Sequence, residues 1–478
     1  MNLSPAAPLT TRWLNPDSPI AAYRNNPLIG ALGPVMTGSQ VLAALTHRPE
    51  YCPSERDLPS HLRAHAVCSL RRLFIPTRAH EAVVSEFGVL LRQGYVHRNP
   101  LDRRYRRLIQ QDRPLLKNDT LPPERFAHIP LLGTSALGTA GTGKTVAFDI
   151  AASGYPQVLE HCYDFERTRV SFKQVVWLKL NLFHDASLKA FGIEFFDRLG
   201  QAVGEPLRKD WGIDRRSGNT IQPLIYLAAR EYNLGMLIVD EVQNMSSLHD
   251  GYQQVLNYFI RMMNCLGLPI AIIGTEAAST LVKLDLAIGR RFLGGIPAFG
   301  PFKRDRVWRA FLHEVWRLEY VRTPSDPDKL SDVVHDLTGG VPDLVIKLYA
   351  LAQTRLFGRK KEEINDRVLK ETAHDLFSVV ADRLLELKGM KTETTGIGRV
   401  REKSDEHFAA LMNDACEKIG APPAFSAVRA GTPAEISPEE PNSSPAKCDE
   451  TTSGMIAAGK SVNVKAALSK LGVLEGAS

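Results

Sequence analysis

Several features that mark other classes of protein are missing from this 478-residue chain. Its six cysteines are scattered, without a CxxC pair or a Cys/His spacing typical of zinc, so neither a disulfide framework nor a zinc site is expected. The longest apolar runs, such as 236–239 and 270–273, are too short to span a bilayer. The first residues lack the basic and apolar stretches of a secretion signal. We therefore expect a cytoplasmic protein with no membrane partner.

A strong charge of either sign is also missing. The net charge is +6 and the pI is about 8.9, a mildly basic balance that permits contact with nucleic acid without requiring it. Hydrophobic residues make up 44% and charged residues 23% of the chain, as in ordinary soluble globular proteins. The composition therefore indicates a folded protein of several domains.

Composition and periodicity divide the chain into five predicted parts. Short apolar runs that alternate with helical patterns in the middle third favour a parallel sheet with crossover helices. The five parts are an irregular N-terminal extension (1–60), an N-terminal helical segment (61–125), an α/β core (126–302), a small helical lid (303–390), and a C-terminal segment with a flexible tail (391–478).

A phosphate-binding loop is predicted from a GxxxxGK[ST] motif. Its glycines let the backbone turn so that N–H groups point at phosphate oxygens. The lysine would supply charge to the β- and γ-phosphates, and the final threonine a hydroxyl to magnesium. The strand expected before the loop, near 133–137, is less apolar than usual. The motif consists of Gly138, Thr139, Ala140, Gly141, Thr142, Gly143, Lys144 and Thr145.

A second motif, Met236–Glu241 (MLIVDE), is a predicted buried strand that ends in two carboxylates. At such a strand tip Asp240 is expected to hold magnesium, together with Thr145. Glu241 is expected to polarise the attacking water as a general base. An acidic pair after a strand is often only a solvated strand end, but together with the phosphate loop it favours nucleotide hydrolysis.

Two further elements complete the predicted catalytic set. Thr275 follows another predicted buried strand, where it would sense the γ-phosphate, position water, or simply cap the strand. Arg290 and Arg291 follow soon after and suit an arginine finger given to a neighbouring subunit's nucleotide, because positive charge stabilises the transition state. A surface arginine pair is the alternative. Since no NKxD guanine-reading motif is present, ATP is favoured over GTP.

The order of these parts resembles that of the AAA+ ATPases, and further stretches resemble the TnsC family, which regulates target choice in cut-and-paste DNA transposons. Ala22–Pro27 (AYRNNP) resembles that family's AYRxNP segment, and Arg92–Pro100 (RQGYVHRNP) resembles its RxGYVxRNP segment. The likeness runs from about residue 21 to 377 and continues at 155–158, 174–176, 187–189, 240–243 and 345–348.

This resemblance implies an AAA+ P-loop fold with a parallel sheet, preceded by an N-terminal helical extension and followed by a helical lid. It implies ATP and Mg²⁺ as cofactors, a slow regulatory ATP hydrolase, and assembly into a ring or helical oligomer on double-stranded DNA. The implied protein partners are a target-selection protein of the TnsD/TniQ type and transposase subunits. The implied DNA contacts, which would track phosphates without reading sequence, are Lys189, Arg215, Arg216 and Ser217.

Several alternatives stay open. Lys189 suits an ordinary exposed helix residue as well as a DNA contact, and the 214–217 loop suits a solvated loop. The basic stretch 103–107 is usually a solvated helix face, although Tyr105 among its arginines allows contact with nucleic acid. Asp343 stands where related initiator ATPases carry a nucleotide-touching arginine, which suits slow turnover. A DNA-binding scaffold with negligible hydrolysis and a replication initiator or loader are the competing functions; the latter would carry a winged-helix domain after about residue 381.

Overall fold

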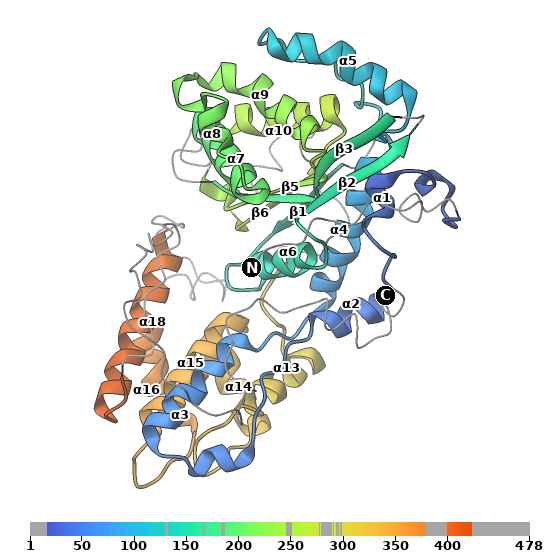
Figure 1. Ribbon diagram of the computed structural model, residues 1–478. Coiled ribbons are helices and arrows are strands. Elements are labelled where there is room, and N and C mark those ends of the chain that lie inside the picture. The colour runs from blue at the N-terminus through green and yellow to red at the C-terminus, as the bar shows by residue number, and fades with distance from the viewer. Residues whose placement is uncertain are drawn as a thin grey trace, which may run out of the picture.

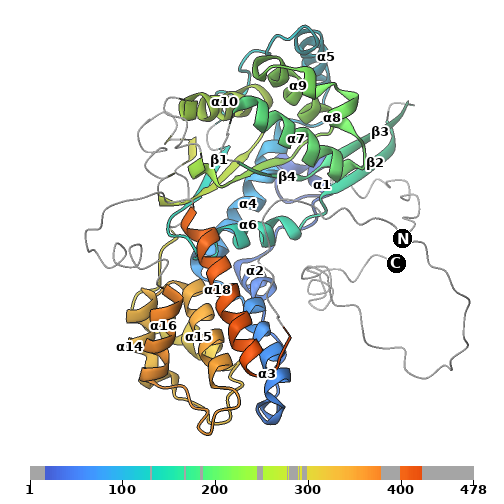
Figure 2. The same ribbon diagram turned by 90° about the vertical axis from the view of Figure 1, so that its left-hand side faces the viewer.

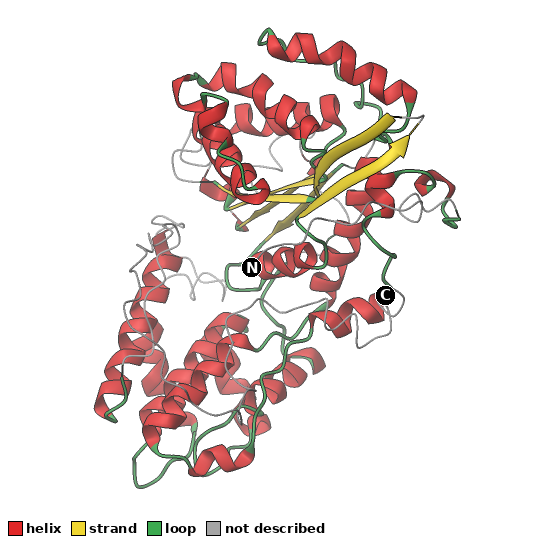
Figure 3. Ribbon diagram, viewed as in Figure 1, coloured by secondary structure: helices red, strands yellow, loops and turns green. Residues whose placement is uncertain are grey.

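The computed structural model describes residues 17–129, 132–165, 168–182, 187–244, 251–276, 299–377 and 399–422, with single positions 278, 289, 291, 292 and 296. Two bodies make up the described chain (Figure 1). One is built around a sheet and carries the strands, whereas the other consists of helices and loops (Figure 3).

A parallel sheet forms the centre of the first body. It consists of β1 (Gly133–Leu137), β4 (Trp177–Asn181), β5 (Met236–Asp240) and β6 (Ile270–Gly274), in the order β1-β6-β5-β4. A separate antiparallel hairpin is formed by β2 (Val158–Phe165) and β3 (Thr168–Val175). The apolar run 174–182 reads as one strand in the sequence, but it is divided between β3 and β4. Its first residues pair with β2, whereas its later residues pair with β5.

Helices cover both faces of this sheet. Alternate strand residues point to opposite faces, so Ile238 and Ala271 lie in one hydrophobic core while Leu237 and Ile272 lie in another. The first core is completed by α4 (Arg78–Val96) and α6 (Lys144–Ser153); the second by α7 (Leu188–Val203), α9 (Gly218–Glu231) and α10 (Gly251–Leu266). The α8 helix (Leu207–Asp210) and the 3₁₀ turn η5 (Ile213–Arg215) connect α7 to α9.

Strand β1 is fully buried although its sequence, GTSAL, is only weakly apolar. The segment at Arg291 and Phe292 explains this. A Cβ on Gly133 would lie 2.3 Å from the carbonyl oxygen of Arg291, and the hydroxyl of Ser135 donates a hydrogen bond of 2.7 Å to the carbonyl of Phe292. Gly133 thus leaves room for the neighbouring backbone, and Ser135 supplies a hydrogen-bond donor to one of its carbonyl groups. Buried backbone carbonyls need such a partner.

The lid contains α13 (Arg306–Trp316), α14 (Pro327–Thr338), α15 (Pro342–Leu356) and α16 (Asp366–Phe377). A further helix, α18 (Arg399–Lys418), lies along α15 and α16 (Figure 2). Phe408, Met412 and Cys416 of α18 are buried in the lid core, at the spacing of four residues that marks one helix face. This helix was not predicted; after it, residues 423–478, which hold the predicted tail, lie outside the described residues.

The N-terminal 125 residues do not form a unit of their own. Residues from η2, α1, α2 and α4 join the core on the α6 side of the sheet, whereas α3 and η4 join the lid core. Helix α5 packs against α9. The elements are η2 (Ala21–Tyr23), α1 (Pro27–Gly30), α2 (Gly38–Leu45), η3 (Pro53–Asp57), α3 (Ser60–Val67), η4 (Cys68–Arg72) and α5 (Arg103–Lys117).

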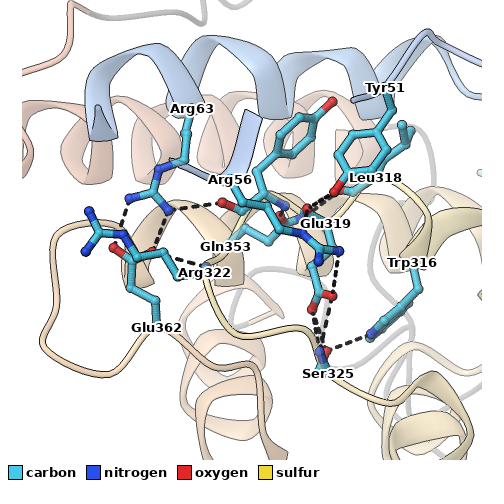
Figure 4. A network of polar contacts seen from close by, with 11 residues as sticks. Tyr51, Arg56, Arg63, Trp316, Leu318, Glu319, Arg322, Ser325, Gln353 and Glu362 are labelled. Atoms are coloured by element: carbon cyan, nitrogen blue, oxygen red, sulfur yellow. Dashed lines mark hydrogen bonds and ion pairs between the residues drawn. The ribbon is translucent and has the colours of Figure 1, made fainter. Parts of the chain in front are cut away.

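Polar contacts join this N-terminal segment to the lid (Figure 4). Arg63 of α3, which is fully buried, donates to both carboxylate oxygens of Glu362, at 2.5 and 2.9 Å, and to the carbonyl of Tyr320. Arg56 donates to the carbonyl of Glu319 at 2.9 Å. Residues 51–73 therefore pack with the lid. The next helix along the chain, α4, instead covers the sheet. No helix among the described residues is sufficiently long and apolar to cross a membrane.

Candidate nucleotide site and nucleic-acid surface

The predicted phosphate loop joins β1 to α6, which is the strand–loop–helix context that the motif requires. Gly138 and Gly143 have positive φ angles of 143° and 88°, which glycine adopts without strain. A Cβ on Gly138 would lie 2.0 Å from the carbonyl oxygen of Phe299, and the N–H of Thr139 donates to that same carbonyl at 3.0 Å. Phe299 therefore fixes the start of the loop, and Gly143 opens α6, whose positive end faces it.

Lys144 lies inside the loop. Its ammonium donates to the carbonyls of Gly138 at 3.0 Å and Thr139 at 2.6 Å, and only 7% of the residue is exposed. Thr142 closes the turn by donating to the carbonyl of Thr139 at 2.7 Å. The loop's one cation is thus held where the motif would place phosphate oxygens.

The two predicted magnesium ligands lie side by side. Thr145 at the start of α6 places its hydroxyl 3.5 Å from a carboxylate oxygen of Asp240, at the end of β5. Lys179 of β4 lies 3.5 Å from the other oxygen of Asp240 and pairs with Asp149 at 2.5 Å. Among the described residues no cluster of three potential metal ligands occurs. This donor set fits Mg²⁺, which binds one or two protein ligands together with substrate phosphates.

Glu241 and Thr275 are linked through a residue that the sequence analysis did not assign. Gln243 donates to a carboxylate oxygen of Glu241, and its own carbonyl oxygen accepts the N–H of Thr275 at 3.0 Å. Glu241 has a φ of 60°, unusual for a residue other than glycine and often found at functional sites. The hydroxyl of Thr275 is buried and has no hydrogen-bond partner within the described chain. Gln243 thus orients the predicted base against the predicted sensor.

Glu276 was missed as well. It accepts a hydrogen bond of 2.9 Å from the hydroxyl of Thr139, so it joins the strand tip of β6 to the phosphate loop. The available signal for Glu276 and Gln243 was only their position, one residue after Thr275 and two after Glu241. Polar residues beside a predicted catalytic residue are common on strand tips, so the pattern alone gave no reason to choose them.

Of the two predicted finger arginines, Arg291 lies among the described residues. Arg290 lies outside the described residues. Arg291 donates to the carbonyls of Ile129 and Ala127, each at 3.2 Å. In this chain its guanidinium is therefore occupied within its own subunit, so service as a finger to a neighbour would require it to leave these carbonyls.

The lid touches the phosphate loop through the first turn of α15. The N–H of Asp343 donates to the carbonyl of Gly141 at 3.3 Å, and a Cβ on Gly141 would lie 3.0 Å from the Cβ of Asp343. The carboxylate of Asp343 pairs with Lys347 at 2.7 Å, and Lys347 also pairs with Asp405 of α18. Although burial lowers the pKa of Lys347, these two carboxylates raise it above its usual range. An acidic group thus stands beside the loop.

The predicted DNA contacts come together on one surface. Helices α7 and α9 run in the same direction. A Cβ on Gly218, at the start of α9, would lie 3.5 Å from the backbone nitrogen of Lys189, at the start of α7. Further along both helices, a Cβ on Gly192 of α7 would lie 2.3 Å from the side chain of Ile221 of α9. Their N-termini are therefore neighbours. Ser187 and Ser217 cap them, each by accepting a backbone N–H.

The charged residues at these two helix starts differ in their surroundings. The side chains of Lys189 and Arg215 are exposed. Arg216 lies 3.6 Å from Asp119, which follows α5. Arg208 holds Asp214 at 2.6 Å, which offsets the acidic charge of the 214–217 loop. The two helix starts are basic because Lys189 and Arg215 are exposed and form no ion pair within the described chain.

The basic helix α5 reaches the same neighbourhood, since Asp119 at its end meets Arg216. Tyr105, which the sequence left open as a nucleic-acid contact, is only 7% exposed and lies in the packed face of α5. Burial raises its pKa. The aromatic ring is thus unavailable for base stacking.

The two N-terminal segments that carry the TnsC resemblance are in contact. The side-chain amide of Asn26 donates to the carbonyl of Tyr95 at 2.7 Å, and that of Asn99 to the carbonyl of Asn25 at 2.9 Å. Arg98, buried in the same place, donates to the carbonyls of Leu234 and Gly235, directly before β5. These segments therefore support the strand that carries Asp240 from its opposite end.

Comparison with known proteins agrees with this architecture. Residues 134–282 match the family described as AAA domain. No curated protein matches the chain. The fold, the loop and the acidic strand tip make the core an AAA+ P-loop domain, which supports nucleotide binding and ATP hydrolysis in general terms.

Solved structures similar to the chain include a Walker-type ATPase, PABY2304 of Pyrococcus abyssi, at 14% identity and a TM-score of 0.36, covering 68% of this chain and 85% of that one. The ORC2 protein of Aeropyrum pernix has 14% identity and a TM-score of 0.34, covering 64% and 79%. Cdc6p of Pyrobaculum aerophilum has 17% identity and a TM-score of 0.36, covering 68% and 83%. Likeness at this level carries no argument about function.

Proposed function

We propose that this chain is an ATP-dependent, DNA-binding regulator of DNA transposition, which assembles on target DNA and links a target-selection protein of the TnsD/TniQ type to transposase. Three features support the proposal: the AAA+ P-loop core, the two N-terminal segments that resemble TnsC, and the basic surface at the starts of α7 and α9. The surface is the observation that carries it, because a nucleotide-binding core alone fits many functions.

The surface suits a DNA backbone for electrostatic reasons. Helix N-termini carry partial positive charge and attract phosphate. At the paired starts of α7 and α9 this charge adds to that of Lys189 and Arg215, both exposed. One such set per subunit, repeated around an oligomer, would follow phosphates and give binding that is independent of sequence and weakened by salt.

ATP acts as the switch in this proposal. Lys144 and the loop N–H groups hold the phosphates, and Glu241 takes the proton of the attacking water. Asp240 and Thr145 would hold Mg²⁺, which would neutralise phosphate charge. Gln243 keeps Glu241 in place. Arg290 or Arg291 of a neighbouring subunit completes the site, so that assembly and hydrolysis are coupled. With Asp343 where a lid arginine would stand, turnover is slow and regulatory.

Electron microscopy and sedimentation of the full chain with duplex DNA, with and without a non-hydrolysable ATP analogue, test the proposal. Rings or spirals that enclose DNA only with nucleotide are expected. Lys144→Ala should abolish them, and the triple variant Lys189→Ala, Arg215→Ala, Arg216→Ala should bind nucleotide normally but lose DNA. Monomers under both conditions, or unchanged DNA binding by the triple variant, would contradict it.

Glu241→Gln separates a switch from a scaffold. In a switch, blocked hydrolysis should leave the variant assembly on its DNA when excess competitor DNA is added without further ATP. Wild-type assemblies should dissociate under the same conditions. A scaffold that uses ATP only as structural support should dissociate at the same rate in both proteins. Co-purification of transposase and of the target-selection protein with the Glu241→Gln assembly then tests the two proposed partners.

A further inference from the structure

A buried histidine lies against the phosphate loop, outside every motif discussed above. His80 is in the first turn of α4 and only 4% of it is exposed. Its Nε2 is 2.7 Å from the position that a Cβ on Gly143 would occupy. No residue in the described chain forms a hydrogen bond with this nitrogen. A polar atom left unsatisfied in a native interior calls for an explanation.

The tautomer of His80 is fixed by its own helix cap. The N–H of Thr77 donates to Nδ1 at 3.0 Å, and the hydroxyl of Thr77 lies 2.7 Å from the same atom. Since Nδ1 accepts, the proton of the neutral ring is on Nε2. Burial lowers the pKa of His80 to about 4, so the ring is neutral near pH 7. The side chain therefore holds one N–H donor against Gly143.

The ring is held in place from two further sides. Phe74 and Phe299 contact it edge to face, with centroid distances of 5.0 and 5.3 Å. Phe299 also accepts the N–H of Thr139 through its carbonyl. One aromatic group therefore contacts both the start of the phosphate loop, through Phe299, and its end at Gly143, where His80 lies nearest and Phe74 lies 3.7 Å from the position of a Cβ.

We propose that His80 is a positioning residue for the phosphate loop: it holds Gly143 so that the loop's N–H groups converge, and its Nε2–H gains an acceptor when nucleotide binds. The inference rests on the nucleotide binding of the proposed function. His80 lies on α4, so the proposal makes the N-terminal segment part of the nucleotide site. The residues just before α4, 51–73, attach the same segment to the lid. The ligand that His80 serves is the phosphate chain, whichever base is attached.

Two substitutions differ in whether they keep the donor at Nε2. In His80→Asn the amide oxygen can take the place of Nδ1 and keep the cap on Thr77, but nothing reaches Gly143. In His80→Gln the amide oxygen can accept the N–H of Thr77, as Gln does at N3 of a capping box, and the amide nitrogen can donate in the place of Nε2. We expect His80→Asn to bind ATP about tenfold more weakly, the change that loss of one hydrogen bond produces, with a melting temperature near that of wild type. His80→Gln, which can retain both the cap and the donor, should keep nearly normal affinity and a melting temperature near that of wild type.

The measurement is binding of fluorescent ATP to the full chain, with thermal unfolding of each variant and displacement by ATP, GTP and inorganic triphosphate. Equal weakening of all three competitors in His80→Asn is expected for a loop that holds phosphates. Weakening confined to ATP would overturn the proposal in favour of a base contact. Unchanged affinity in His80→Asn, or affinity that follows melting temperature across both variants, would also overturn it. A wild-type chain that binds no nucleotide would instead contradict the proposed function.

Discussion

The N-terminal segment meets the lid and the nucleotide-binding core by different chemistry. On the lid side Arg63 is matched by a carboxylate, Glu362, inside the hydrophobic core. On the core side Arg98 donates to the main-chain carbonyls of Leu234 and Gly235. Burial accordingly lowers the pKa of Arg98. The lid contact thus includes a buried ion pair between two side chains besides its hydrogen bonds to backbone carbonyls, whereas the hydrogen bonds of Arg98 go to backbone carbonyls, among them the two that lead to the site.

The largest expected effect comes from breaking the buried ion pair. Arg63→Ala leaves the carboxylate of Glu362 buried without its partner, which should cost about 3–5 kcal/mol. Arg48 and Glu314 join the same two regions at the surface, with side chains 48% and 24% exposed, so Arg48→Ala should cost less than about 1 kcal/mol. Urea unfolding with hydrogen exchange measures both. Equal effects would show that burial does not govern this contact.

Acid should weaken the two sides in different pH windows. His80 has its folded pKa near 4, below the ordinary value of 6.5, so its contribution to stability is complete above pH 6.5 and is lost as the pH falls towards 4. The loss is about 3 kcal/mol. Stability measured at steps between pH 7 and 4 should show this slope in wild type and not in His80→Asn.

The lid contact should respond only at lower pH. Burial raises the pKa of Glu362, but hydrogen bonds from Arg63 and from the N–H of Gly358 outweigh it and hold the pKa below 4.5. Its contribution is therefore present above pH 4.5 and lost as the pH falls through its folded pKa. Hydrogen exchange in α3 and α15 should stay protected at pH 5. Loss of protection there between pH 6.5 and 5 would contradict this assignment.

A matched pair of tyrosines gives a smaller contrast. Tyr95 is fully buried on the core side and donates to the carbonyl of Asn233 at 2.9 Å. Tyr51 donates to the carbonyl of Glu319 at 2.7 Å on the lid side, where Arg56 donates to the same oxygen. Tyr95→Phe should therefore cost about 1–2 kcal/mol and Tyr51→Phe under about 1 kcal/mol in urea unfolding. The opposite order would show that the core contact tolerates loss of its hydrogen bond.

The smallest expected effect is where the lid meets the phosphate loop. Asp343→Asn removes a carboxylate beside Gly141, so ATP should bind a few-fold more tightly, as expected for a partly exposed charge screened by water. Asp405→Asn is the control, because it removes the other carboxylate of Lys347 without removing one from the loop. Equilibrium titration with fluorescent ATP measures both. Weaker binding by Asp343→Asn would instead indicate that its pairing with Lys347 shapes the site.

Local patterns predicted much of the core. The glycines of the loop and the apolar runs before Asp240 and Thr275 act over a few residues, so the strands β5 and β6 and the α/β class were predicted and are confirmed. The motif-based roles of Lys144 and Glu241 stay predictions. Gln243 and His80 were missed, because each matters through a partner that is distant in sequence or unremarkable in type.

The sequence by itself determined which faces are apolar, where the chain must turn, and that a phosphate loop precedes an acidic strand tip. Only the tertiary structure decided what each apolar face packs against. The helical patterns of α3 and α4 are alike in kind, yet α3 belongs to the lid and α4 to the core. Amphipathic periodicity specifies that a face is buried, whereas its partner is selected by shape and by groups such as Glu362, which lie hundreds of residues away.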